Sequence, residues 1–193
     1  MHTLTESKKQ QAACEACYLL NDAIGDLVAL KRLFDSTHMW EQLAPTPLQA
    51  IRTSRRLLLM NLVIVLYRLK ETRQQLLVDW LLSDAELLAL GFPSIDEVVG
   101  GKGNWPYFEI LRGQYAGHSF AKKNFKGPGR IVKPSALGEA QRKTGLFESD
   151  NFLKRARGLV PGIEKVRDEL VLRYPEARGF LKKYNSELER GDI

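Results

Sequence analysis

The amino-acid sequence predicts an all-α protein, a helical bundle in one domain over residues 1–193. Apolar residues recur at spacings of three and four along most of the chain, as on one face of a helix. No stretch alternates apolar and polar residues as a half-buried strand does, and the breaks between apolar segments coincide with proline, glycine and capping residues. A hydrophobic content of 44% over 193 residues is enough for one substantial core.

Two long helices are expected first. The apolar periodicity predicts an amphipathic helix from Leu4 to about Phe34, followed by a loop over Asp35 to Pro47. Pro47 suits the first turn of a second helix that runs to about Leu82. Because a short loop joins them, we expect the two helices to form an antiparallel hairpin, in which the apolar run from Leu57 to Tyr67 is the most buried segment.

Two short helices follow the hairpin. Ser83 and Glu86 have the spacing of a capping box, and Gly91 can end the helix that they begin. Ser94 and Glu97 repeat the signal before the glycine pair at 100–101.

A central helix is expected from about Trp105 to Asn124, with Asn104 as its cap and Pro106 near its start. A basic turn sequence over Lys126–Arg130 comes next. The remainder is predicted to be helical, over Ala136–Thr144 and from Ser149 to the end, with interruptions near Pro161 and Pro175.

The charge favours an anionic partner. Lys and Arg number 29 against 23 Asp and Glu, a formal net charge of +6, and nucleic acid is the first polyanion to consider. The polar N-terminus lacks the pattern of a secretory signal, so we expect a cytoplasmic protein. No apolar run reaches the roughly 20 residues of a membrane span, and we expect no membrane partner.

The two cysteines, Cys14 and Cys17, lie in a helical pattern with no second pair, and we interpret them as small packing residues rather than as a redox or metal site. His2 is near the terminus and His38 is in the expected loop, where solvent is the usual partner. His118 is therefore the histidine of interest. Because one histidine and few nearby carboxylates cannot form a closed site, we expect no metal and no cofactor.

His118 ends the segment Arg112-Gly113-Gln114-Tyr115-Ala116-Gly117-His118, with an arginine six positions before it on a predicted helix. An arginine followed by four to six residues and a histidine, on a helix of an all-α bundle, resembles the signature of the HEPN superfamily. The small residues before His118 are similar to those of its abortive-infection and toxin-like members.

This resemblance implies a metal-independent endoribonuclease of toxin or phage-defence type that leaves 2′,3′-cyclic phosphate ends. His118 would transfer the proton and Arg112 would bind the phosphate. The resemblance also implies a homodimer with facing motifs, and a toxin of this kind can be neutralised by a protein partner that masks or modifies its site.

The residues after the motif agree with RNA as the substrate. Basic side chains follow His118 closely, and Tyr115 is a candidate stacking surface for an unpaired base. The RNA-binding candidates are Tyr115, Lys122, Lys123, Lys126 and Arg130.

One departure leaves an alternative open. HEPN proteins commonly have a polar residue directly after the arginine, whereas this chain has Gly113. The alternative is a non-catalytic helical module with a degenerate motif, which binds nucleic acid or protein. The charged residues near the C-terminus, among them Arg155 and Arg157, are mixed with carboxylates and are interpreted as surface ion pairs.

Overall fold

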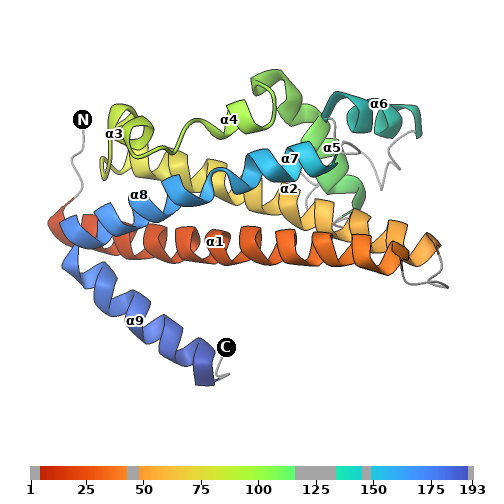
Figure 1. Cartoon of the computed structure of the whole chain (residues 1–193). Helices are drawn as coiled ribbons and strands as arrows, with labels where there is room; N and C mark the ends of the chain where they lie inside the picture. The colour runs from red at the N-terminus through yellow and green to blue at the C-terminus, as the bar shows by residue number, and fades with distance from the viewer. Residues whose placement is uncertain (1–4, 43–47, 116–133, 145–148, 191–193) are drawn as a thin grey trace, which may run out of the picture. The chain divides into compact units, whose positions relative to one another are not determined.

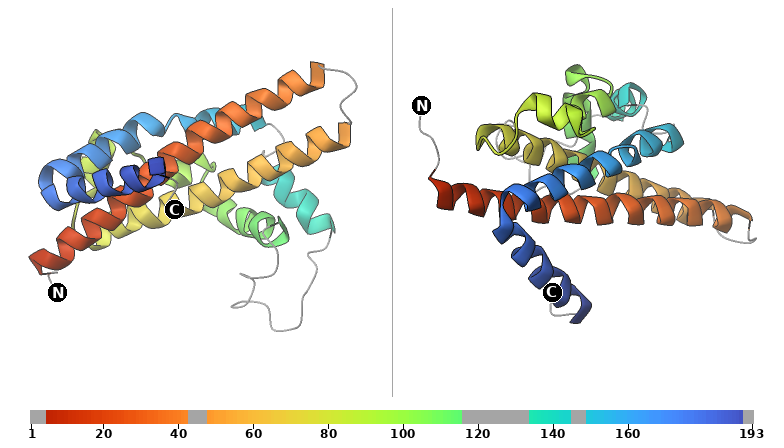
Figure 2. Two further views of the ribbon diagram at one scale, coloured as in Figure 1. Left: turned by 90° about the horizontal axis from the view of Figure 1, so that it is seen from below. Right: turned by 60° about the vertical axis from the view of Figure 1, so that its left-hand side comes forward.

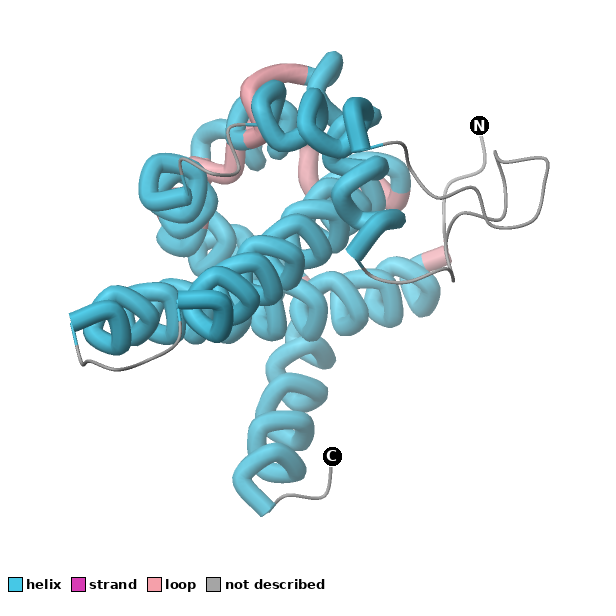
Figure 3. Tube along the Cα trace, turned by 90° about the vertical axis from the view of Figure 1, so that its right-hand side faces the viewer, coloured by secondary structure: helices cyan, strands magenta, loops and turns pink. Residues whose placement is uncertain are grey.

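The structure, a computed structural model, describes residues 5–42, 48–115, 134–144 and 149–190. Every regular element in these ranges is helical (Figures 1 and 3), and the all-α prediction is confirmed for them. None of the helices in this part of the chain is both long enough and apolar enough to cross a membrane.

The chain forms two compact units, each described by itself below. Unit 1 comprises Met1–Gly25, Arg68–Ser94 and Gly158–Ile193, and unit 2 comprises Asp26–Tyr67 and Ile95–Arg157. The two long helices α1 (Glu6–Gln42) and α2 (Leu48–Val78) each contribute to both units. The expectation of a single domain over residues 1–193 stays a prediction.

A heptad-like seam explains why α1 packs along α2. The buried positions of α1 follow alternating spacings of three and four, which is the pattern of coiled-coil packing. They are Ala13, Ala16, Leu20, Ala23, Leu27, Leu30, Phe34 and Thr37, and Cys17 is buried beside this series. In unit 2 Arg55 of α2 donates to Thr37, and in unit 1 Arg68 donates to Asp22. From the first pair to the second the residue number falls along α1, from 37 to 22, and rises along α2, from 55 to 68. The two helices therefore run in opposite directions, which confirms the predicted antiparallel hairpin.

The expected end of the first helix at Phe34 is wrong, because α1 continues to Gln42. Residues 35–42 are helical, His38 included, instead of forming a loop. Thr37 is the reason. Its side chain is fully buried, donates to the carbonyl of Phe34 at 2.7 Å and accepts from Arg55 at 3.0 Å. The Thr37 hydroxyl makes both hydrogen bonds and can therefore be buried at a seam position where the apolar pattern alone predicted the end of the helix.

In unit 1 the helix α3 (Asp84–Ala89) begins with the predicted capping box. Ser83 Oγ accepts from the amide of Glu86 at 3.3 Å, and the Glu86 carboxylate accepts from the amide of Ser83 at 2.6 Å. The same carboxylate accepts from Arg173 of α8 (Val160–Arg173) at 2.7 Å. Helix α9 (Pro175–Arg190) follows α8 and diverges from it in both views of Figure 2.

Three helices end in the same backbone motif, with one residue in the left-handed region. In α3 this residue is Gly91 (φ 82°), and in α4 (Ile95–Val98) it is Gly100 (φ 81°). In α2 it is Trp80 (φ 57°). The backbone amide of Trp80 donates to the carbonyl of Leu77, and the amide of the next residue donates to the carbonyl of Leu76. These are the two hydrogen bonds of a Schellman cap. The expected end of the second helix near Leu82 is therefore wrong, since the cap ends α2 at Val78.

Two glycines in unit 1 bring the end of α3 against α8. A Cβ added at Gly162 would lie well inside the van der Waals distance of the Gly91 carbonyl carbon and oxygen. Glycine is therefore the one residue that fits position 162 without moving a backbone. The contact fixes α3 on α8 close to the buried side chain of Phe92.

Unit 2 contains α4, the short helix η1 (Lys102–Asn104), α5 (Trp105–Tyr115), α6 (Pro134–Thr144) and α7 (Ser149–Arg157). Helix α6 begins two residues earlier than expected, because Pro134 occupies its first turn. The breaks expected near Pro161 and Pro175 are confirmed as the starts of α8 and α9. The central helix is described only to Tyr115, and the expected remainder to Asn124 lies outside the described residues.

Replacing Gly162 with alanine should destabilise the protein by about 3 kcal/mol, because overpacking against a backbone cannot relax by a rotamer change. Urea unfolding followed by circular dichroism measures the change. Gly179→Ala is the matched control, since a Cβ at that α9 position meets nothing within 4 Å. The control should be neutral or gain up to about 1 kcal/mol from helix propensity. Equal effects of the two substitutions would contradict the close approach of α3 and α8.

Glu86 should give unit 1 an acid-sensitive contribution to stability. Its pKa is lowered from 4.5 to about 2, first by the amide of Ser83, then by the Ser83 hydroxyl and by Arg173. A carboxylate with a lowered folded-state pKa stabilises above about pH 4.5 and loses this effect as the pH falls toward 2. We expect Glu86→Gln to cost stability at pH 6, and the cost to shrink steadily between pH 4.5 and 2. Glu164→Gln, at an exposed position of α8, is the control, and a cost for Glu86→Gln that is constant with pH would contradict the assignment.

Candidate functional site

The candidate site is built on α5, which is held in unit 2 by a row of aromatic side chains. Trp105 lies edge-on to Tyr67 of α2 at 4.7 Å between ring centroids and is 5.9 Å from Phe108. Phe108 stacks on Phe152 of α7 at 5.5 Å. All four side chains are buried. Packing of this kind adds about 0.5–1.5 kcal/mol per pair beyond area burial, so α5 has a defined place between α2 and α7.

Polar contacts fix the N-terminal end of the same helix. The Tyr67 hydroxyl donates to the carbonyl of Trp105 at 3.3 Å, and the indole of Trp105 donates to the Asp96 carboxylate. Asn104 was expected to cap α5. Its side-chain amide donates to the carbonyls of Val99 at 2.8 Å and Gly100 at 3.3 Å, and so ties the start of α5 to the end of α4.

Helix α6 packs on α5, and the two lie side by side in Figures 1 and 2. Among the α6 side chains that the structure describes, Ala140 and Thr144 are buried, one turn apart, and the Thr144 hydroxyl donates to the Ala140 carbonyl at 2.8 Å. Arg142 and Lys143 are exposed. A small buried face and a basic exposed face therefore accompany the helix that carries the motif.

The structure describes part of the predicted motif. Arg112 stands in the last turn of α5, one turn after the buried Phe108, and Gly113 and Tyr115 complete that helix. His118 lies outside the described residues, as do Lys122, Lys123, Lys126 and Arg130. The predicted pairing of Arg112 with His118 therefore stays a prediction. What the structure adds is the anchoring of the helix that positions Arg112.

The net positive charge belongs to unit 2. The sequence of unit 2 contains 17 Lys and Arg against 9 Asp and Glu, a net charge of +8. Unit 1 contains 12 against 14, a net charge of −2, which together with unit 2 accounts for the +6 of the whole chain. The motif therefore stands in the unit whose charge attracts polyanions.

The described arginines differ in whether a carboxylate lies beside them. In unit 1 Arg73, Arg167 and Arg173 each form an ion pair with a carboxylate. In unit 2 the exposed Arg142 and Arg157 have no carboxylate within 4 Å among the described side chains. Arg155, which was expected to join surface ion pairs, instead lies over the ring of Phe152 at 5.7 Å. Its guanidinium covers the end of the aromatic row.

The cysteines pack in unit 1 as expected. Cys17 is fully buried in α1, and its thiol lies 3.8 Å from the carbonyl of Arg167. Burial raises the pKa of Cys17 to about 12, and burial with the charge of Glu176 raises the pKa of Cys14. Both groups are thiols at neutral pH, which is the unreactive form. Among the described side chains, no three His, Cys, Asp or Glu residues are grouped closely enough to hold a metal ion.

Sequence reasoning missed two features of this site. The aromatic row was not predicted, because its members come from α2, α5 and α7 and are brought together only by tertiary packing. The exposed cations of α6 were not predicted as part of the site, because they are distant from the motif in sequence and the packing of α6 on α5 cannot be read from the sequence.

Comparisons with protein-family models, with curated proteins and with solved structures gave no match. The resemblance to HEPN proteins therefore rests on the motif and on the helical layout.

Proposed function

We propose that this protein is a metal-independent endoribonuclease resembling the HEPN toxins and phage-defence ribonucleases. The observation that carries the proposal is the place of Arg112, in the last turn of an anchored helix within the unit of net charge +8. An arginine on an anchored helix in a positively charged unit suits a phosphodiester better than the near-neutral surroundings of unit 1 do.

The proposed chemistry needs no metal ion. The 2′-hydroxyl of the RNA attacks the adjacent phosphorus atom, and His118 accepts the hydroxyl proton, since unperturbed imidazole titrates near neutral pH. Arg112 donates two hydrogen bonds to the phosphate oxygens, on which negative charge accumulates in the transition state. Protonation of the departing 5′-oxygen completes the cleavage. The products are a 2′,3′-cyclic phosphate and a 5′-hydroxyl.

The second candidate is a binding module without catalysis, and Gly113 is the observation that favours it. Glycine offers no side chain at the position where HEPN proteins commonly have a polar group. In this reading Arg112 and the cations of unit 2 still bind nucleic acid or an acidic protein, and no bond is cut.

Helical geometry favours a homodimer. Positions six apart on a straight helix differ by about 120° around the axis and about 9 Å along it, so Arg112 and His118 of one helix do not point at one phosphate oxygen. Either Gly113 and Gly117 let the helix bend, or the same segment of a second chain completes the site. We propose the second arrangement, in which a two-fold contact between two copies of the motif segment brings two of each residue into one cleft. A protein partner that neutralises the activity would have to cover this cleft or modify it.

Cleavage of mixed RNA in EDTA is the direct test. We expect the wild-type protein to cut and His118→Ala to lose about 10²–10⁴-fold in rate, as expected for removal of a general acid or base. Arg112→Lys should lose most of the activity with unchanged folding, because lysine keeps the charge but not the planar fork. His38→Ala, at the histidine on α1, is the matched control and should keep full activity.

Three results would count against the ribonuclease. They are cleavage that requires a divalent metal, cleavage that persists in His118→Ala, and tight RNA binding with no cleavage by the wild type. The last result supports the binding module. Equal activity of Arg112→Lys would show that a point charge at this position is sufficient.

Sedimentation equilibrium tests the homodimer, for which we expect twice the mass of one chain at micromolar concentration. We expect the interface to include the predicted central helix from Trp105 to Asn124, and Glu109 is exposed on the described part of that helix, α5. Glu109→Arg replaces an anion with a cation on each side of a contact that already brings two Arg112 guanidinium groups together, and should therefore favour the monomer. Glu164→Arg on α8 makes the same charge change outside the interface and should leave the dimer intact. A monomeric wild-type protein, or equal behaviour of the two variants, would contradict the arrangement.

A further inference from the structure

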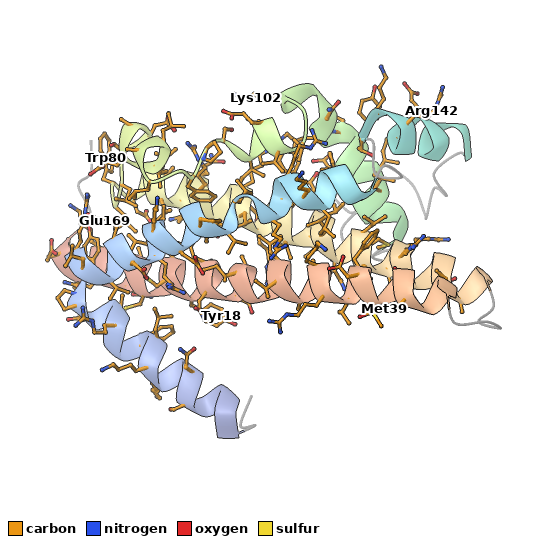
Figure 4. All side chains as sticks on the ribbon, viewed as in Figure 1. Tyr18, Met39, Trp80, Lys102, Arg142 and Glu169 are labelled. Carbon is orange, nitrogen blue, oxygen red and sulfur yellow. The ribbon has the colours of Figure 1, made fainter. Side chains whose placement is uncertain are left out.

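Three exposed cations stand on the two elements that flank α5. Lys102 belongs to η1, which leads directly into α5, and Arg142 and Lys143 belong to the last turn of α6, which packs on α5. Figure 4 labels Lys102 and Arg142, both on the upper edge of the view. We call these three residues the α5-flanking cations.

The α5-flanking cations have no ion-pair partner among the described side chains. Exposed cations without an ion-pair partner, in the unit of net charge +8, are suited to bind phosphates of a nucleic-acid backbone. Arg142 and Lys143 also lie at the C-terminal end of α6, where cations favour the helix dipole. That structural role needs no ligand, so the test must separate stability from binding.

We infer that Lys102, Arg142 and Lys143 form an RNA-backbone site distinct from the predicted cleavage motif, and that the substrate is an RNA chain long enough to reach both. The inference rests on the proposed function in taking RNA as the ligand. It adds that the substrate is a longer RNA chain. A dinucleotide would contact only the motif, whereas a longer chain would also contact the cations of α6 and η1. Backbone contacts carry affinity without reading the base sequence. The site therefore sets length preference and salt dependence rather than sequence specificity.

The test measures the binding of fluorescein-labelled single-stranded RNA of about 20 nucleotides by anisotropy, in EDTA and in the His118→Ala background. The variant is Lys102→Gln/Arg142→Gln/Lys143→Gln. Loss of three single-strand phosphate contacts should lower the slope of log Kd against log salt by about 2 and raise Kd at least about tenfold near physiological salt. A dinucleotide should bind both proteins equally.

The matched control is Lys165→Gln/Arg178→Gln/Lys182→Gln, which removes three exposed cations from unit 1. The net charge changes equally, so a difference between the two triple variants reports on position rather than on total charge. Thermal unfolding of both variants shows whether loss of the helix-end cations has affected folding.

The expected result is a lower slope and weaker binding for the unit 2 variant alone, with similar melting temperatures. Equal losses in the two variants, or no loss in the unit 2 variant, would overturn the inference. Binding to anionic lipid vesicles or to an acidic protein in place of RNA would overturn it as well. The ribonuclease proposal fails separately, if wild-type protein does not cleave, and RNA binding through these three residues can stand without it.

Discussion

The packing of Trp105 and Phe108 between Tyr67 and Phe152 is the interaction on which the candidate site depends. These side chains come from three helices that are distant along the chain, and they give α5 its place in unit 2. A functional arginine is effective only when its helix is held in a defined position. The hydrogen bonds of Tyr67, Asn104 and Trp105 further restrict the position of α5, because each one links the start of this helix to a neighbouring element. Arg112 then stands in the last turn of a helix whose first two turns are anchored.

The chain contains one unit that is near-neutral and one that is positively charged. Unit 1 satisfies many of its charges internally, as in the linked contacts of Ser83, Glu86 and Arg173, and its two thiols are held in the unreactive form. Unit 2 carries the excess of cations and presents Arg142 and Lys143 next to the motif-bearing helix. A polyanion such as RNA is the ligand class that this distribution favours, and both the ribonuclease proposal and the binding-module alternative depend on it.

Features with local causes were predictable from the sequence. The capping box at Ser83, the glycine at position 91 and the helix starts at Pro161 and Pro175 are set by residues within one turn of one another, and the structure confirms them. Features that depend on tertiary partners were not predictable. The helix α1 continues through Thr37 because Arg55 of another helix donates a hydrogen bond to the Thr37 hydroxyl. Trp80 has the left-handed backbone conformation that is normally expected of glycine. The site divides in the same way. The motif at Arg112 is a local pattern that the sequence reveals, whereas the aromatic row that supports it joins residues 38 and 44 positions apart, as for Tyr67 with Trp105 and Phe108 with Phe152.

Hydrogen exchange and an RNA cleavage assay on two matched core variants test whether the aromatic row positions the site. Phe108→Leu removes one ring from the aromatic row that holds α5, and Phe92→Leu makes the same substitution at a fully buried position in unit 1. If the anchoring of α5 positions the site, Phe108→Leu speeds amide exchange in α5 and lowers RNA cleavage, while Phe92→Leu speeds exchange around α3 and leaves cleavage at the wild-type rate. Equal losses of cleavage in the two variants, or faster exchange in α5 of Phe108→Leu with unchanged cleavage, would contradict a role of the aromatic row in positioning the site.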